Sequence, residues 1–314
     1  MTKIQSVLGP LDTADLGFTL MHEHVLVAPP ATLKDYPELL GPHPLERAVE
    51  SLKAAKAGGV ETIVDLTTLD LGRDVDFLAE VSLRSGVNIV ATTGWWLDYP
   101  RWFEGVSADQ LADLFVREIE KGMAGTEVKA GLLKSASDLG GVTPAAETVL
   151  RAVARAHHRT GVPIALHSYA PGRVAFEQLA IMKQERVPLS RIKIDHCNDT
   201  TDVEYLLKLL DMGCYLGLDR YPGRLVSPTG RTRTLKALID AGFADRLCPS
   251  HDHSALWVEA EHPMISREDH LRANPYGYLY MKKAVFPELL EMGVSQKVID
   301  RLCVVGPRKF LEGA

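Results

Sequence analysis

The segment Phe18-Thr19-Leu20-Met21-His22-Glu23-His24 gives the first indication of the architecture, because an apolar, strand-like run ends there in two histidines. Successive side chains of a strand point to opposite faces, so His22 and His24 share one face. The neighbouring Leu20 indicates that this face is buried. The segment therefore predicts a buried strand that presents two imidazoles at its carboxyl end.

Four other apolar runs end in the same way, each with one polar residue suited to a metal centre. Lys134 closes 130–133, His167 closes 163–166, His196 closes 192–195 and Asp252 follows 246–250. Each histidine alone could be an ordinary core residue. Because each residue ends a different strand-like run, one shared chemical site explains the set more simply.

Apolar runs of about five residues alternate with longer segments of helical period, which is typical of parallel strands joined by helices. The strand candidates are 18–21, 61–66, 87–92, 130–134, 163–167, 192–196, 214–218 and 246–250. The helix candidates lie near 44–57, 74–85, 107–124, 145–160, 173–185, 202–212, 231–241 and 276–292. Eight such units predict a (β/α)8 TIM barrel as a single domain over residues 1–314, with its active site at the carboxyl ends of the strands.

An open, doubly wound sheet is the alternative fold, but no G-x-G-x-x-G follows the first strand. The first 17 residues contain turn signals and predict a short hairpin that caps the barrel floor. The stretch 254–274 is too long for a bare connector, so we expect it to form a lid over the pocket.

The composition excludes several classes of protein. The chain has 314 residues, 46% of them hydrophobic, and a formal net charge of −6 with acidic and basic residues interspersed. This distribution argues against a nucleic-acid partner. No apolar run approaches the roughly 18 residues of a membrane span, and the start lacks a secretory signal, so we expect no membrane and a cytoplasmic protein.

Neutral imidazoles and carboxylates suit divalent ions such as zinc, manganese, cobalt or iron, and the lack of cysteine ligands favours an open, catalytic site. Lys134 is the unusual member, because an ammonium among metal ions would be repelled. One solution is a carbamate formed from the amine and carbon dioxide, which would bridge two ions. The alternative is a plain ammonium paired with Asp252.

The stretch Gly17-Phe18-Thr19-Leu20-Met21-His22-Glu23-His24-Val25 resembles the first signature of the phosphotriesterase family, a branch of the amidohydrolase superfamily. The segment 129–134 resembles the part of that family that bears its carboxylated lysine. The resemblance implies two divalent ions bridged by an N6-carboxylated Lys134 and a hydroxide. One ion would be held by His22, His24 and Asp252, and the other by His167 and His196.

The same resemblance implies hydrolysis, in which the bridging hydroxide attacks the substrate and Asp252 takes its proton. His251 is expected either to relay this proton or to hold a neighbouring group by a hydrogen bond. A homodimer is also implied by the resemblance.

The motif Gly217-Leu218-Asp219-Arg220-Tyr221 resembles that of the family's lactonase branch and favours lactones. Trp96 stands where those lactonases usually have a tyrosine and phosphotriesterases proper have a tryptophan. We predict a pocket lined by Trp96, Arg220, Tyr221 and Trp257, and a substrate that is a lactone or another carboxylic ester, with weaker triesterase activity. The alternatives are a phosphotriesterase proper, a mononuclear deaminase of the superfamily, and a metal-holding binding protein without turnover.

Overall fold

The computed structural model describes residues 2–223, 225–258 and 272–313. Within these residues, one sheet contains nine strands in the order β10-β9-β8-β7-β6-β5-β4-β3-β11, and all neighbouring strands are parallel. Their bounds are β3 (Thr19–Val27), β4 (Thr62–Asp65), β5 (Asn88–Gly94), β6 (Leu132–Ser137), β7 (Ile164–Ser168), β8 (Ile192–Ile194), β9 (Tyr215–Leu218), β10 (Leu247–Pro249) and β11 (Ser254–Trp257). The eight predicted strands are confirmed, and β11 is an addition.

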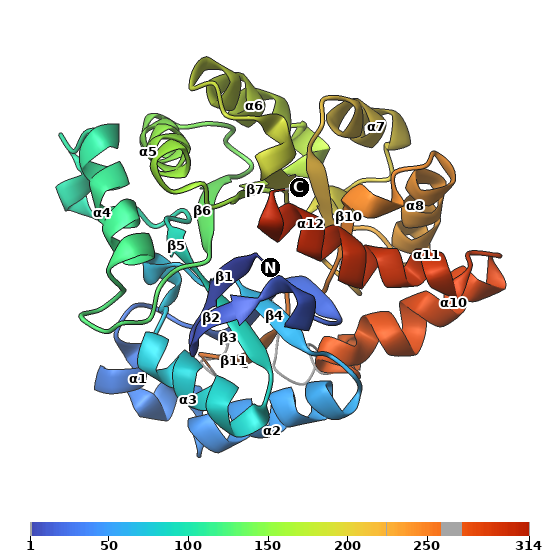
Figure 1. Ribbon diagram of the computed structural model, residues 1–314, viewed down its shortest axis with the longest axis horizontal. Helices are drawn as coiled ribbons and strands as arrows, with labels where there is room; N and C mark the ends of the chain where they lie inside the picture. Colours follow the sequence, from blue (N-terminus) through green and yellow to red (C-terminus); the bar gives the residue numbers. More distant parts are fainter. Residues whose placement is uncertain (1, 224, 259–271, 314) are drawn as a thin grey trace.

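The sheet closes on itself where the chain passes from β10 through residues 250–253 into β11. The Asp252 N–H donates to the His22 carbonyl over 3.1 Å, and the His24 N–H donates to the His253 carbonyl over 2.8 Å. Helices surround this barrel on the outside, as Figure 1 shows. The predicted TIM-barrel fold is therefore confirmed.

The helices between the strands lie close to their predicted positions. They are α2 (Pro44–Ala57), α3 (Val75–Ser85), α4 (Ala108–Glu120), α5 (Pro144–Thr160), α6 (Ala175–Gln184), α7 (Val203–Asp211) and α8 (Pro228–Asp240). The last predicted helix, 276–292, is divided into a 3-10 turn, a π-helical turn η10 (Met281–Val285) and α10 (Phe286–Glu291). The chain then forms α11 (Gln296–Asp300) and α12 (Gly306–Glu312).

The predicted hairpin consists of β1 (Lys3–Ser6) and β2 (Gly9–Asp12), which pair antiparallel. The Val7 N–H donates to the carbonyl of Ile89, near the amino end of β5, over 2.9 Å. Figure 1 shows the hairpin and α12 lying across one end of the barrel. The hairpin thus covers the amino end and leaves the carboxyl end for the site.

Apolar side chains inside the barrel form a floor beneath the site. They belong to a small buried cluster that includes Met21, Val64, Val90, Leu132, Ala165, Tyr215 and Cys248. Lys134 lies two residues after Leu132, and His167 lies two residues after Ala165, so each shares a strand face with that apolar residue. Strand alternation therefore places the polar residues directly above this floor.

The prediction that Leu20 shares the inner face of β3 with His22 and His24 is wrong. Leu20 packs in the large core cluster with residues of the surrounding helices, whereas Met21 belongs to the floor. The pairing of β3 with β4 shifts register between Leu20 and Glu23, and this irregularity restores His22 and His24 to the inner side.

The predicted lid, 254–274, begins as strand β11, and residues 259–271 lie outside the described part of the chain. Among the residues that are described, no helix combines the length and apolar content needed to cross a membrane.

Candidate metal centre

The two histidines of β3 meet the carboxylate of Asp252. The Nε2 atoms of His22 and His24 lie 3.3 and 3.1 Å from Asp252 Oδ1. Asp252 has a left-handed backbone (φ 53°) in the connection that follows β10. Strand alternation on β3 and this backbone turn together bring three donor atoms to one point.

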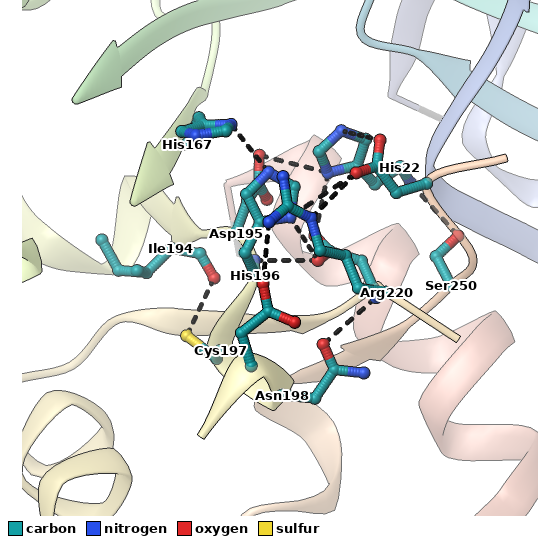
Figure 2. A network of polar contacts seen from close by, with 12 residues as sticks. His22, His167, Ile194, Asp195, His196, Cys197, Asn198, Arg220 and Ser250 are labelled. Carbon is teal, nitrogen blue, oxygen red and sulfur yellow. Dashed lines mark hydrogen bonds and ion pairs between the residues drawn. The ribbon is translucent and has the colours of Figure 1, made fainter. Parts of the chain in front are cut away.

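A second pair of donors lies beside the first. His167 ends β7, and His196 follows β8 in a left-handed conformation (φ 63°). His167 Nδ1 and His196 Nε2 are 2.8 Å apart, and the rings of His22 and His196 have centroids separated by 4.9 Å. Figure 2 shows His22, His167 and His196 gathered in one network.

The other ring nitrogen of each histidine has a hydrogen-bond acceptor. His22 Nδ1 and His196 Nδ1 donate to the two oxygens of Asp219 over 2.9 and 3.0 Å. His167 Nε2 donates to Asp138 over 3.1 Å. These protonated nitrogens leave the facing nitrogens unprotonated, which is the tautomer that binds metal.

His24, like His22 and His196, carries its proton on Nδ1. Its Nδ1 lies 2.8 Å from the Thr67 hydroxyl oxygen, and that hydroxyl donates to the Leu26 carbonyl over 3.3 Å. The hydroxyl must therefore accept from His24, so that His24 Nε2 carries the lone pair that faces Asp252.

Burial favours the neutral form of three of these imidazoles. It lowers the pKa of His22 and His167 below the ordinary value, and the pKa of His196 well below it. Ligand atoms of His22, His196 and Asp252 all lie within 4.8 Å of one another. Neutral nitrogens that face each other and a carboxylate fit divalent cations, which bind such donors in proteins.

Lys134 also lies in this centre, but its partner differs from the one considered for an ammonium. Its Nζ lies 2.6 Å from Asp195 Oδ2, so the ion pair involves Asp195 rather than Asp252. The other oxygen of Asp195 contacts Lys193, whose Nζ is 3.8 Å from Asp219. Burial lowers the pKa of Lys134, and the neighbouring Lys193 adds to this despite Asp195.

His251 lies outside the cluster of facing donors. Its Nδ1 is 2.6 Å from Glu23 Oε1, and its Nε2 accepts a hydrogen bond of 3.0 Å from the Met281 N–H. Because both ring nitrogens are occupied in the wall of the site, this geometry supports the hydrogen-bonding role and not the proton relay.

Two of the four predicted pocket residues contact the metal-centre residues. Trp96 Nε1 donates to His167 Nδ1 over 3.3 Å. Arg220 donates from Nε to Asp252 Oδ2 over 3.0 Å and from a terminal nitrogen to Asp199 over 2.7 Å. Figure 2 shows Arg220 among the polar residues of this network, near His196 and His22.

The other two pocket residues lie differently. Tyr221 is 1% exposed and packs in the large core cluster. Trp257 ends β11, where it pairs with Val27 of β3 and is half-buried.

Several polar residues of the centre were not selected from the sequence. Lys193 lies in β8 and Asp195 follows its last residue, and such charged residues at every second position of an apolar run are a detectable signal of an inward face. Asp219 lies within the motif that gave Arg220. Asp138 and Thr67 follow strands, and no periodic pattern marks them.

Comparison with known proteins agrees with this geometry. The model of the phosphotriesterase family matches residues 2–311. The chain is 39% identical to the phosphotriesterase homology protein of Mycobacterium tuberculosis (strain CDC 1551 / Oshkosh), over 99% of this chain and 98% of that protein. It is 36% identical to the aryldialkylphosphatase of Saccharolobus solfataricus, over 96% of each chain. A solved structure of the phosphotriesterase from Mycobacterium tuberculosis matches with a TM-score of 0.92 and 38% identity, over 99% of this chain and 98% of that one. The chain therefore belongs to the phosphotriesterase family, whose members are hydrolases.

Proposed function

We propose that this protein is a binuclear metal-dependent hydrolase that cleaves a lactone or another carboxylic ester, with weaker phosphotriesterase activity. One observation carries the proposal. The unprotonated nitrogens of four imidazoles and a carboxylate oxygen of Asp252 face one another, and every opposite ring nitrogen is held by an acceptor. A buried cluster of lone pairs without a cation would be costly, so the arrangement supports bound divalent ions.

The donors divide into two groups. We assign His22, His24 and Asp252 to one ion, and His167 and His196 to the other. Lys134 is near enough to His22 to lower the pKa of that imidazole, and the lowered pKa of Lys134 itself favours the neutral amine that reacts with carbon dioxide. N6-carboxylation of Lys134 would convert a cation into a bridging anion and remove its repulsion of the ions. Zinc suits these donors, as do manganese, cobalt and iron.

The chain's own residues would then orient the reaction. Bound ions would supply Lewis acidity and an activated water. We assign to Asp252 the acceptance of the proton from the attacking water, because its carboxylate lies beside the histidines of β3 and is oriented by Arg220. Trp96 presents an indole next to His167 and forms an apolar wall for the acyl group.

The substrate class rests on Arg220 and Trp96 together. Arg220 beside Asp252 agrees with the lactonase-like motif, whereas Trp96 resembles the phosphotriesterases proper. The name aryldialkylphosphatase of one relative also keeps the phosphotriesterase alternative open. A mononuclear deaminase would leave Lys134 without a role. We further propose a homodimer and a cytoplasmic location, as the sequence predicted.

The test is a steady-state comparison of a lactone panel, aryl esters and paraoxon-like triesters, using protein reconstituted with Zn²⁺ or Co²⁺ in bicarbonate buffer. We expect kcat/KM to be highest for a lactone or carboxylic ester. If no lactone or ester is turned over while triesters are, the phosphotriesterase alternative replaces this assignment. A metal content of one ion per chain together with deamination would favour the mononuclear alternative.

A further inference from the structure

Glu23 lies between the two histidines of β3, and neither the ion assignment nor the proton transfer uses it. Its side chain is fully buried, with 0% exposure. Strand alternation points it away from His22 and His24, toward the connection after β10. A carboxylate in such a place must be satisfied by hydrogen bonds, because burying an unpaired charge is costly.

Glu23 obtains these bonds from the residues around Asp252. Its Oε1 accepts from the Ser250 hydroxyl (2.6 Å), the His251 N–H (3.0 Å) and His251 Nδ1 (2.6 Å). Its Oε2 accepts from the His253 N–H over 3.0 Å. The donors thus come from both sides of Asp252 in the sequence.

The backbone of Asp252 needs such support. Its φ of 53° is uncommon for a residue other than glycine and persists where the surroundings fix it. The main chain contributes two hydrogen bonds to β3, from the Asp252 N–H and to the His253 carbonyl. Glu23 adds the side-chain attachment on the opposite face of β3.

The same carboxylate sets the state of His251. Because His251 Nε2 accepts from the Met281 N–H, the proton lies on Nδ1 and is donated to Glu23. Met281 begins the π-helical turn η10, and π-helical turns are frequent at functional sites. Just before it, the Tyr278 hydroxyl donates to the His24 carbonyl over 2.6 Å. One buried network therefore connects β3, the residues around Asp252 and η10.

We propose that Glu23 is a positioning residue that holds the Asp252 carboxylate against the Nε2 atoms of His22 and His24. The inference rests on the proposed function, because it concerns the presentation of Asp252 to an ion. A glutamine could accept at only one oxygen position. With its oxygen at the Oε1 position, its amide nitrogen would face the His253 N–H, and residue 252 would shift.

The test compares Glu23→Gln with the wild type in Co²⁺-loaded protein. We expect Co²⁺ affinity to fall about 10–100-fold. The visible absorption bands of bound Co²⁺ should change. At saturating Co²⁺, kcat for the ester or lactone that the wild type hydrolyses best should fall at least about tenfold. KM for the same substrate should change less than about threefold, since substrate contacts are not altered.

Glu118→Gln is the matched control. Glu118 is a half-buried glutamate, and it bonds to Arg73 and Thr93 away from the centre. This variant should lower Tm but keep the wild-type Co²⁺ bands and kcat. Ser250→Ala removes one donor to Glu23 together with the longer, 3.3 Å bond that the Ser250 hydroxyl accepts from the His22 N–H. A smaller loss of Co²⁺ affinity in this variant tests the proposal if Glu23→Gln does not fold.

Wild-type bands, affinity and kcat in Glu23→Gln would overturn the inference, as would the same spectral change in Glu118→Gln. Wild-type Co²⁺ affinity in Ser250→Ala, when Glu23→Gln does not fold, would overturn it too. Failure of the proposed function is distinguishable, because the wild type itself would then bind no Co²⁺.

Discussion

Replacing Asp219 with asparagine should weaken both proposed ion sites at once, because this carboxylate bonds to one histidine of each donor group. Its Oδ2 accepts from His22 Nδ1, and its Oδ1 accepts from the N–H and Nδ1 of His196. An asparagine has one acceptor oxygen, so its amide nitrogen would face the protonated nitrogen of one of these histidines. The other histidine would lose the assistance of a negative charge.

The size of the effect follows from the number of bonds lost. Removing a partner that orients a metal-binding histidine typically costs 10–100-fold in metal affinity, or about 1.4–2.7 kcal/mol. We expect a loss of this size for each of the two ions in Asp219→Asn. In Thr67→Val, only His24 loses its partner. Only the ion assigned to His22, His24 and Asp252 should then be bound more weakly.

The assay is a competition titration of Zn²⁺ against a chromophoric chelator, followed for both binding steps. If Asp219→Asn bound both ions as tightly as the wild type, the Asp219 carboxylate would not orient the two histidines for metal binding. If Asp219→Asn weakened only one of the two Zn²⁺ binding steps, Asp219 would not connect the two groups of donors.

Two further predictions concern residues outside the ion sites. Asp70 accepts a hydrogen bond from the Trp96 N–H at 3.1 Å. The substitution Asp70→Asn should therefore move Trp96 in the pocket wall, raise KM about threefold or more with kcat nearly constant, and change tryptophan fluorescence. An unchanged KM across the ester panel would contradict this prediction. Hydrogen bonding to Arg301 is the main cause that lowers the pKa of Asp245 from 3.8 to about 2. The ion pair of Asp245 with Arg301 therefore stabilises the folded state above pH 3.8, by about 1 kcal/mol after solvent screening. This stabilisation is lost as the pH falls toward 2. Thermal unfolding from pH 5 to 2 should show a steeper loss of Tm in the wild type than in Asp245→Asn, and parallel curves would disprove the assignment.

The barrel and the gathering of the metal-centre residues could be predicted from the sequence because both depend on local periodicity. Apolar runs of strand length mark the strands, and parallel strands in a barrel end at one rim. His167 and Lys134 could therefore be placed from their positions alone. Strand β11 could not be predicted, because its four residues continue directly from the β10 connection and pair only with the distant β3.

The predictions that depended on side-chain partners were weaker. Leu20 suggested the correct face of β3 for the wrong reason, since a register irregularity intervenes. The partner of Lys134 is Asp195, which β8 brings close by its register with β7. His251 follows strand β10 as closely as Asp252 does, but Glu23 draws its ring into the wall. Such choices depend on contacts between residues far apart in the chain, which periodicity does not contain.

The metal content per chain decides whether the protein holds two divalent ions together with a carboxylated Lys134. Protein reconstituted with Zn²⁺ in bicarbonate buffer should contain about two ions per chain by elemental analysis. Lys134→Met should contain one or fewer and lose ester hydrolysis. A wild-type protein that retains no zinc, or a Lys134→Met variant that still holds two ions per chain and remains active, would contradict the account.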